Sequence, residues 1–373
     1  MTALTFVALV VGLVCLVGGA ELLVRGAASV ATRFGIPPVI IGLTVVAFGT
    51  SAPELAVSVS AGFSGEGEVA FGNVAGSNIV NILLILGGSA VIGTLAVSQR
   101  IIRLDIPLLI GVSLVALLMS LDNEIGRLDG AVLFVGIVAY TWWLIRAARD
   151  ERADVLEEYD EAVDSLEVDV IDKPLAVQVA LVLAGLGVLI VGSQFLVTSA
   201  TDIAEDLGVS DLVIGLTVVA VGTSLPELAT SFLASLRGQR DIAVGNVIGS
   251  NLFNLMCVLG LTGVVSPDPV PVADSSLRVD FPVMLAATLV LVPIIWKGFE
   301  IRRGEGLVLM AFYGLYVTYL VLDANDSGTA DTIRLVVLVL TPLVFAAFTA
   351  AALRARREGQ ASGAQPPLPG TTR

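Results

Sequence analysis

The sequence predicts an all-α integral membrane protein made of two inverted-topology five-helix repeats and one extra C-terminal transmembrane helix. Three observations predict it. Only 14% of the 373 residues are charged and 56% are hydrophobic, whereas soluble domains are about 25% charged. The chain matches itself when it is shifted by 173 residues. Each half also contains five apolar runs, which is an odd number.

Each apolar run is long enough for a helix of about 20 residues to cross a bilayer. The first half has runs at 4–31, 36–62, 68–95, 104–121 and 129–148, and the second half has runs at 175–204, 209–235, 241–265, 279–297 and 305–322. An eleventh run, 332–353, has no partner in the first half. The first run lacks the positive start of a secretory signal, so we interpret it as the first span.

These runs divide the chain into five parts. We expect a first membrane repeat, an acidic cytoplasmic connector, a second membrane repeat, an extra transmembrane helix and a disordered tail, at 1–149, 150–173, 174–323, 324–358 and 359–373. The connector is predicted to be solvated because 11 of the 23 residues from Asp150 to Asp172 are acidic. The tail is rich in Pro and Gly, a composition typical of disorder.

The internal repeat is strongest around the second and third spans of each half. Residues 42–87 align with 215–260 without a gap, and 26 of the 46 positions are identical. Because five crossings place the two ends of a repeat on opposite sides, the second repeat must lie upside down relative to the first. Inverted repeats of this kind are typical of secondary transporters.

The positive charges predict the orientation. With the N-terminus outside, 17 of the 20 Lys and Arg residues fall on the inner side, and only Arg127, Arg278 and Arg334 fall outside. We therefore expect a multi-pass protein of the cell membrane with the N-terminus outside and the C-terminus in the cytoplasm.

Composition also excludes several classes of protein. A sequence pI near 4.4 argues against a nucleic-acid partner. The chain has no His and two Cys, so zinc, copper and iron centres are not expected, nor is a cofactor. It has no HExxH motif and no nucleophile elbow in a plausible setting, so we expect a protein that is not an enzyme. No obligate protein partner is evident beside the lipid bilayer.

Polar residues in the spans are concentrated in two paired motifs. GTSAPE at 49–54 pairs with GTSLPE at 222–227, and GNVAGSN at 72–78 pairs with GNVIGSN at 245–251. Glu54 and Glu227 lie deep in their spans, where a carboxylate is costly, so both are expected to be functional. The alternative is a pair of protonated or hydrogen-bonded glutamates that only hold helices together.

Proline precedes each glutamate and opens the helix one turn earlier. Carbonyl groups near Ala47, Gly49 and Thr50, and near their repeat partners, are then available to a cation, although a plain kink is the alternative. Thr50 and Glu54 share a helix face with Ala47 one turn earlier and Ser51 beside them. This all-oxygen set suits a hard cation.

The second motif places a polar residue at every fourth position. Asn73, Ser77 and Asn81 form one stripe, and Asn246, Ser250 and Asn254 form the other. We favour four of these as ion ligands, namely Ser77, Asn81, Ser250 and Asn254. For Asn73, Asn78, Asn246 and Asn251, helix packing through small and polar residues explains the sequence equally well.

Two carboxylates with carbonyls, hydroxyls and amides can supply the six to eight oxygens that Ca²⁺ takes. The two negative charges balance one Ca²⁺ or two Na⁺. Competition of this kind for one site is the minimum that an antiporter needs.

With these doubled motifs the chain resembles the cation/calcium exchanger superfamily, in its prokaryotic sodium/calcium exchanger branch. The resemblance covers ten of the eleven predicted spans. It implies that the first and sixth helices slide as a gating bundle. It also implies Ca²⁺ ligands at Glu54, Glu227 and the carbonyls of Thr50 and Thr223. The flanking Na⁺ sites that it implies are at Ala47, Ser51, Ser77, Ala220, Ser224 and Ser250.

The sequence departs from many members of that superfamily at one position. Asn81 and Asn254 are both Asn, whereas many relatives have Asp in the second repeat, so we expect no K⁺ dependence.

The expected function is a secondary antiporter that exchanges Na⁺ for Ca²⁺ by alternating access. A proton-coupled Ca²⁺ exchanger is the main alternative, because a buried glutamate can itself carry H⁺; a passive channel and a membrane hydrolase are weaker ones.

Overall fold

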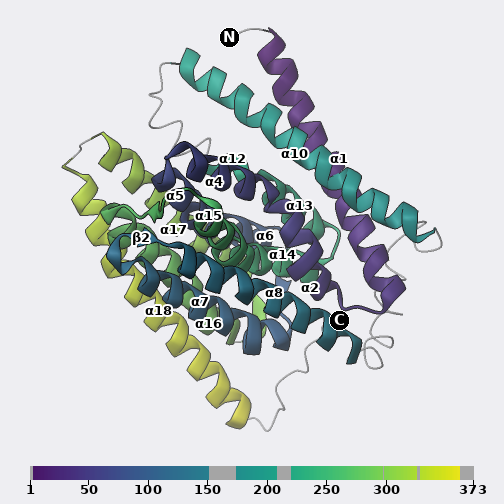
Figure 1. Ribbon diagram of the computed structural model, residues 1–373. Coiled ribbons are helices and arrows are strands. Elements are labelled where there is room, and N and C mark those ends of the chain that lie inside the picture. Colours follow the sequence, from purple (N-terminus) through teal and green to yellow (C-terminus); the bar gives the residue numbers. More distant parts are fainter. Residues whose placement is uncertain (1–2, 151–173, 208–219, 297, 326–327, 362–373) are drawn as a thin grey trace.

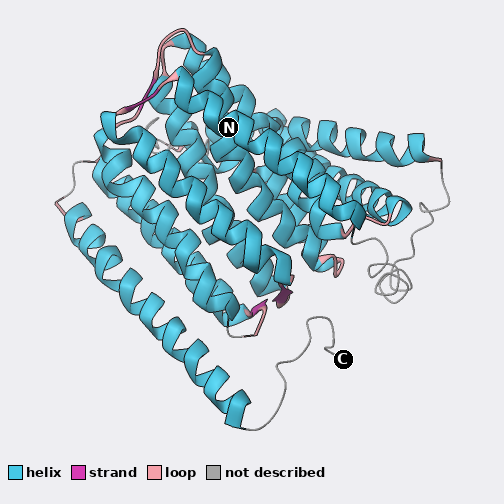
Figure 2. Ribbon diagram, turned by 60° about the horizontal axis from the view of Figure 1, so that its bottom comes forward, coloured by secondary structure: helices cyan, strands magenta, loops and turns pink. Residues whose placement is uncertain are grey.

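The structure is a computed structural model that describes residues 3–150, 174–207, 220–296, 298–325 and 328–361. The predicted acidic connector and most of the predicted tail lie outside these residues, as does the start of the predicted span 209–235. The described chain is almost entirely helical, and its long helices run side by side in a bundle (Figures 1 and 2). The all-α membrane fold predicted from the sequence is confirmed.

The first half contains five helical stretches in sequence order. They are α1 (Ala3–Phe34); α2 (Pro38–Ile41), η1 (Gly42–Val46), α3 (Ala47–Thr50) and α4 (Ala52–Ser64); α5 (Gly67–Ile79), η2 (Val80–Leu86) and α6 (Gly87–Ile92); η3 (Ile101–Asp105), α7 (Ile106–Met119) and η4 (Ser120–Asp122); and α8 (Arg127–Asp150). The segments η1, η2 and η3 are π-helical turns within otherwise continuous helices. The second stretch is bent by 44° between Thr50 and Ala52.

The second half repeats this order. Its stretches are α10 (Leu175–Asp206); α12 (Ala220–Thr223) and α13 (Leu225–Leu236); α14 (Arg240–Phe253), η6 (Asn254–Val258) and α15 (Leu259–Val265); η7 (Ser276–Asp280) and α16 (Phe281–Trp296); and α17 (Arg303–Ala324). The extra helix α18 (Ala330–Ala361) follows and lies along the outer edge of the bundle (Figure 1). Within the described residues, nine helices are long and apolar enough to cross a membrane, or ten with the bent stretch.

Two short strand pairs show that the halves are inverted. β1 (Leu95–Ala96) follows the third stretch of the first half and pairs with β4 (Glu300–Ile301), which follows the fourth stretch of the second half. β2 (Glu124–Ile125) follows the fourth stretch of the first half and pairs with β3 (Val270–Pro271), which follows the third stretch of the second half. The fourth helices of the two halves therefore end on opposite faces of the bundle, which we call the β1–β4 end and the β2–β3 end.

The centre of the bundle is formed by the second and third stretches of each half. The helix from Arg240 to Val265 is the most enclosed, and the stretch Gly67–Ile92 is the next. Both are surrounded by other helices, so their polar side chains face protein rather than lipid. By contrast, α1 and α10 lie together at the periphery, against one side of the remaining helices (Figure 1).

Glycine allows α1 and α10 to approach closely. A Cβ added at Gly19 would lie 2.8 Å from the amide nitrogen of Leu189 and 2.9 Å from the carbonyl oxygen of Gly185. Small residues promote this kind of backbone contact between membrane helices. The pair is therefore expected to move as one unit.

Gly19→Leu is expected to disrupt this packing, because the new side chain has no space between the two backbones. Overpacking of this kind costs about 1–3 kcal/mol. The neighbouring Gly18→Leu is the matched control, since a Cβ at Gly18 meets nothing within 4 Å. Thermal unfolding of the purified protein in detergent should show a loss of stability for Gly19→Leu alone. Equal losses in both variants would contradict the close contact.

Candidate functional site

Glu54 is fully buried in the first turn of α4, directly after the bend. Its Oε1 atom accepts hydrogen bonds from Ser224 Oγ at 3.0 Å and from Ser77 Oγ at 3.5 Å. The other oxygen, Oε2, has no hydrogen-bond partner among the described residues. One serine belongs to the same half as Glu54 and the other to the opposite half.

Glu227 has the corresponding arrangement in the first turn of α13 and is also fully buried. Its Oε1 atom accepts hydrogen bonds from Ser51 Oγ at 3.1 Å and from Ser250 Oγ at 3.5 Å, and Oε2 again has no described partner. Each glutamate is thus held across the pseudo-symmetry axis by the serine that lies beside the other one. The structure brings Glu54, Glu227 and the four predicted serines into one site.

The two helices break at the predicted positions. Ser51 has φ −79° and ψ 6°, and Ser224 has φ −87° and ψ 8°, so both leave the helical conformation. The proline two residues later has no N–H to continue the ladder. The Ala47 carbonyl is less free than the sequence suggests, because it accepts bonds from the Ser51 amide at 3.0 Å and from Thr50 Oγ1 at 3.4 Å. Ala220 begins the described part of its helix.

Asn73 and Asn246 fasten these broken helices. Asn73 Nδ2 donates to the backbone carbonyl of Glu54 at 3.1 Å, and its Oδ1 accepts from Thr223 Oγ1 of the opposite half at 3.3 Å. Asn246 does the same with the carbonyl of Glu227 at 3.4 Å and with Thr50 Oγ1 at 3.2 Å. The Thr50 and Thr223 side chains therefore bind protein.

Asn78 and Asn251 have a different environment. Asn251 Nδ2 donates to the carbonyl of Asn78 at 3.3 Å, and the Asn78 amide contacts the Met284 sulfur at 3.6 Å. Neither side chain bonds to a glutamate. Of the two alternatives left open by the sequence, helix packing describes this pair, whereas Asn73 and Asn246 contact the glutamate backbones.

Asn81 and Asn254 are fully buried at the π-helical turns η2 and η6. Neither side-chain oxygen nor side-chain nitrogen of either residue has a partner among the described residues. A buried polar group without a hydrogen bond costs about 1–3 kcal/mol, so this arrangement is unfavourable unless a ligand uses the groups. The donor set around the two glutamates is all oxygen apart from amide nitrogens, which suits hard cations.

Two serines that the sequence analysis did not single out also belong to this network. Ser58 Oγ accepts from Asn73 Nδ2 at 2.9 Å, and Ser231 Oγ accepts from Asn246 Nδ2 at 2.9 Å. Both lie four residues after a glutamate, on the same helix face, and both are identical between the repeats. That shared spacing was the signal for them.

A second pair of buried acids lies outside the site. Tyr140 donates to Asp105 Oδ1 and Tyr316 donates to Asp280 Oδ1, each at 2.8 Å. These bonds join the fourth and fifth helical stretches of each half. Their symmetry shows that the repeat extends beyond the central motifs.

Comparison with known proteins decides the family. The sequence model of the family described as sodium/calcium exchanger protein matches residues 4–146 and 177–322, which cover both halves. The chain belongs to the sodium/calcium exchanger family. It is therefore similar to transporters rather than to enzymes, and the resemblance stated from the doubled motifs is confirmed.

The matches to individual relatives extend over nearly the whole length of each relative. The putative antiporter CaxA of Alkalimonas amylolytica is 42% identical over 82% of this chain and 95% of its own. The sodium/calcium exchanger MaX1 of Methanosarcina acetivorans is 32% identical over 86% and 99%. A solved structure of the sodium-calcium exchanger NCX_Mj matches with a TM-score of 0.72 and 29% identity, over 85% of this chain and 99% of the other. The family match ends at residue 322, before α18.

Proposed function

We propose that this exchanger carries Na⁺ and Ca²⁺ in opposite directions by alternating access at the site between Glu54 and Glu227. The observation that supports it is the crosswise arrangement of two fully buried carboxylates, each bonded to serines of both halves. A site shared by two inverted halves changes its geometry when the halves move relative to each other. Ion binding and the opening of either end are then coupled.

The ligands in this proposal divide into three groups. Ca²⁺ binds the carboxylates of Glu54 and Glu227 and the carbonyls of Thr50 and Thr223. Na⁺ binds flanking positions at Ala47, Ser51, Ser77, Ala220, Ser224 and Ser250. The amide oxygens of Asn81 and Asn254 complete the centre. Two carboxylates neutralise one Ca²⁺ or two Na⁺, so the two kinds of ion exclude each other.

The relatives support this choice of ions. MaX1 is named a sodium/calcium exchanger, and the matching NCX_Mj exchanger was soaked with Na⁺ and Ca²⁺. The MaX1 match covers most of this chain, and NCX_Mj has the same fold. Coupling to Na⁺ rather than to H⁺ is the part of the proposal that a transport experiment must decide.

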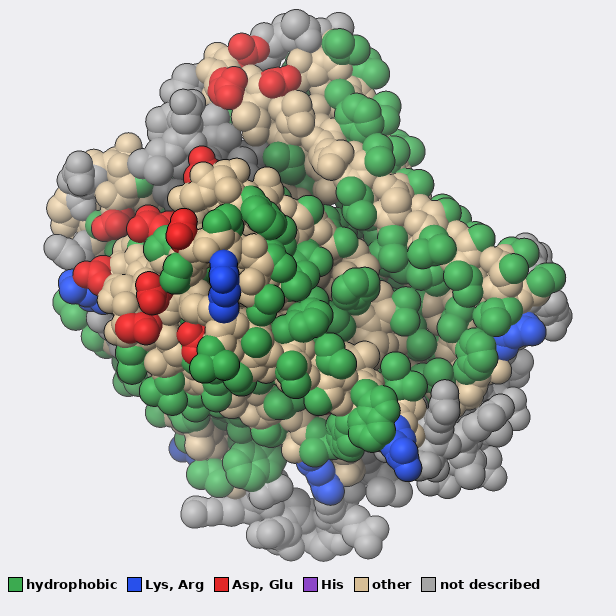
Figure 3. Space-filling view, in the orientation of Figure 1, with side chains coloured by type: hydrophobic (Ala, Val, Ile, Leu, Met, Phe, Trp, Pro, Cys, Tyr) green, Lys and Arg blue, Asp and Glu red, His purple; other side chains and the backbone are tan. Residues whose placement is uncertain are grey.

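We also propose that the β1–β4 end faces the cytoplasm of the cell, with the N-terminus outside and the C-terminus inside. Acidic side chains gather toward one end of the face in Figure 3, most basic ones in view lie toward the other end, and hydrophobic side chains cover the area between. Near the β1–β4 strands lie basic residues, including Arg100 and Arg303, as the positive-inside rule requires.

Radioactive Ca²⁺ uptake into proteoliposomes tests the proposed exchange. Vesicles loaded with NaCl and diluted into Na⁺-free medium at constant pH should accumulate Ca²⁺ well above vesicles loaded with KCl, because outward Na⁺ flow drives inward Ca²⁺ flow. Addition of K⁺ to the medium should not be required. Uptake driven only by a proton gradient would show a proton-coupled exchanger instead. Uptake without any counter-ion would show a channel.

A further inference from the structure

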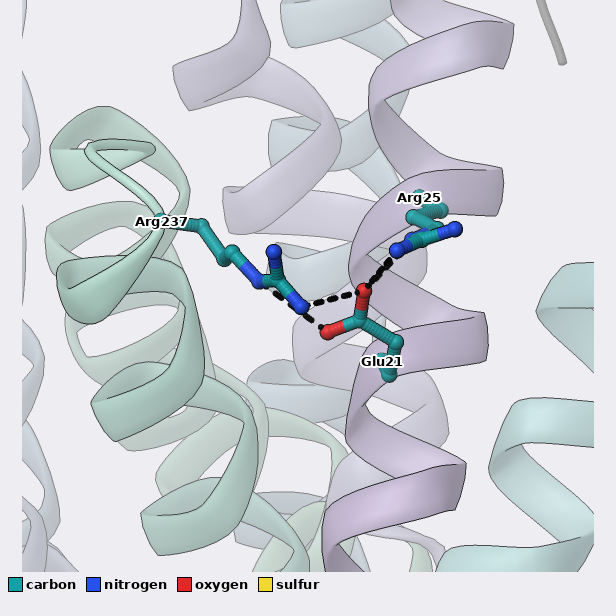
Figure 4. A network of polar contacts seen from close by, with 3 residues as sticks. All are labelled: Glu21, Arg25 and Arg237. Carbon is teal, nitrogen blue, oxygen red and sulfur yellow. Dashed lines mark hydrogen bonds and ion pairs between the residues drawn. The ribbon is translucent and has the colours of Figure 1, made fainter. Parts of the chain in front are cut away.

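An ion-pair network joins the peripheral helix α1 to the site helix α13. Glu21 of α1 accepts hydrogen bonds from Arg237 at both carboxylate oxygens, at 2.8 Å from the terminal guanidinium nitrogen and 3.2 Å from Nε. Arg25, one turn further along α1, also bonds to Glu21 (Figure 4). Arg237 directly follows α13, the helix that begins beside Glu227.

The network lies at the β1–β4 end of the described bundle. Helix α14 starts at Arg240 and leads to β3, so Arg237 lies at the opposite, β1–β4 end. There α1 packs against α13 and α14 through buried side chains, with Val24 and Ala28 beside Ala234. At the β2–β3 end the corresponding helices are α10 and α4, and these two described helices make no comparable contact. Among the described residues, α1 and α13 are therefore packed together, whereas α10 and α4 are not comparably packed. We call this arrangement closed at the β1–β4 end.

The repeat shows that this asymmetry is built into the sequence. The offset of 173 residues aligns Glu21 with Gln194, Arg25 with Thr198 and Arg237 with Ser64. None of the three corresponding residues is charged. When the opposite end closes, its helices have no equivalent ion pair to form.

We propose that the Glu21–Arg237 ion pair is a latch that stabilises the state closed at the β1–β4 end over its inverted counterpart. This inference rests on the proposed alternating access, because exchange between the two states requires α1 and α13 to separate. Interactions present in only one of two states shift the equilibrium between them. The latch thus regulates which side of the membrane the Glu54–Glu227 site faces.

Spin-label distances test the latch without relying on transport. Nitroxides attached to Val17→Cys on α1 and Leu236→Cys at the end of α13 report this separation, since both positions are exposed. The native cysteines are replaced by Cys15→Ala and Cys257→Ala in the same full-length chain. The parent should show mainly the short distance. Glu21→Gln and Arg237→Gln should each raise the ratio of long to short distances by about two- to fivefold, the effect expected of a partly exposed ion pair.

The double variant and a matched control make the test specific. Glu21→Gln with Arg237→Gln should give a shift no larger than either single change, because the second change removes a bond that is already lost. Arg240→Gln removes an exposed positive charge from the same end and should leave the distances unchanged. Unchanged distances in Glu21→Gln and Arg237→Gln, or fully additive shifts, would overturn the latch.

Moving the ion pair to the other end is a gain-of-function test. Gln194 and Ser64 are both exposed. Gln194→Glu combined with Ser64→Arg should favour closure between α10 and α4, and so raise the long-distance population between α1 and α13. No change would count against the latch. Ca²⁺ uptake by the unlabelled wild-type protein is measured separately, so a failure of the proposed exchange is distinguishable from a failure of the latch.

Discussion

Glu54→Gln and Glu227→Gln should each abolish Na⁺-dependent Ca²⁺ exchange. Glutamine has nearly the shape of glutamate and can still accept a hydrogen bond from the serines, so the helices should remain in place. The substitution removes one of the two charges that balance Ca²⁺. Removing one member of a buried charge pair costs about 2–5 kcal/mol, which corresponds to a loss of about 30-fold or more in ion affinity. Radioactive Ca²⁺ uptake into Na⁺-loaded vesicles measures the effect.

Acids on the surface provide the control for this prediction. Glu66 and Glu68 lie near the start of α5 and are exposed, so their glutamine variants lose the same charge without touching the site. Their uptake should match that of the wild type. Normal exchange in both Glu54→Gln and Glu227→Gln would remove the two-glutamate site from the proposal.

Asn81→Leu and Asn254→Leu are expected to strengthen the ion-free protein and weaken Ca²⁺ binding. Both native amides are fully buried and have no described hydrogen-bond partner, and such a group costs about 1–3 kcal/mol. Leucine is similar in size and removes that cost. It also removes an oxygen ligand, which should lower the apparent Ca²⁺ affinity by about 10- to 100-fold, the usual value of a polar contact to a charge. Thermal unfolding with and without CaCl₂ measures both effects.

Aspartate variants are the matched controls, because aspartate has nearly the shape of asparagine and keeps the side-chain oxygen that leucine lacks. Asn81→Asp and Asn254→Asp should retain stabilisation by Ca²⁺, whereas the leucine variants should lose it, because only a ligand that binds the folded state raises its stability. Leucine variants with unchanged Ca²⁺ affinity would show that these amides are not ligands. Leucine variants that unfold more easily without ions would show that the amides have a structural role.

The sequence alone determined the class of fold and the residues at its centre. Hydropathy fixes helix positions in a membrane, because each unsatisfied backbone group in lipid is costly. The 173-residue repeat made Glu54 and Glu227 a pair and predicted that the halves are inverted. Proline two residues after each serine located the break in each helix. These signals are local or repeated, so they need no knowledge of helix packing.

Which side chains contact each other became visible in the three-dimensional packing of the helices. Ser224 bonds to Glu54, although it lies three residues from Glu227, and Ser51 bonds to Glu227 in the same way. Asn73 and Asn78 occupy one motif, yet one contacts a glutamate carbonyl and the other contacts Met284. The sequence also did not predict the difference between the two ends of the molecule. At one end α1 packs on α13, and Glu21 and Arg237 link these helices. Contacts between residues far apart in the chain depend on the angle and register at which helices pack, and spacing along the sequence does not determine either one.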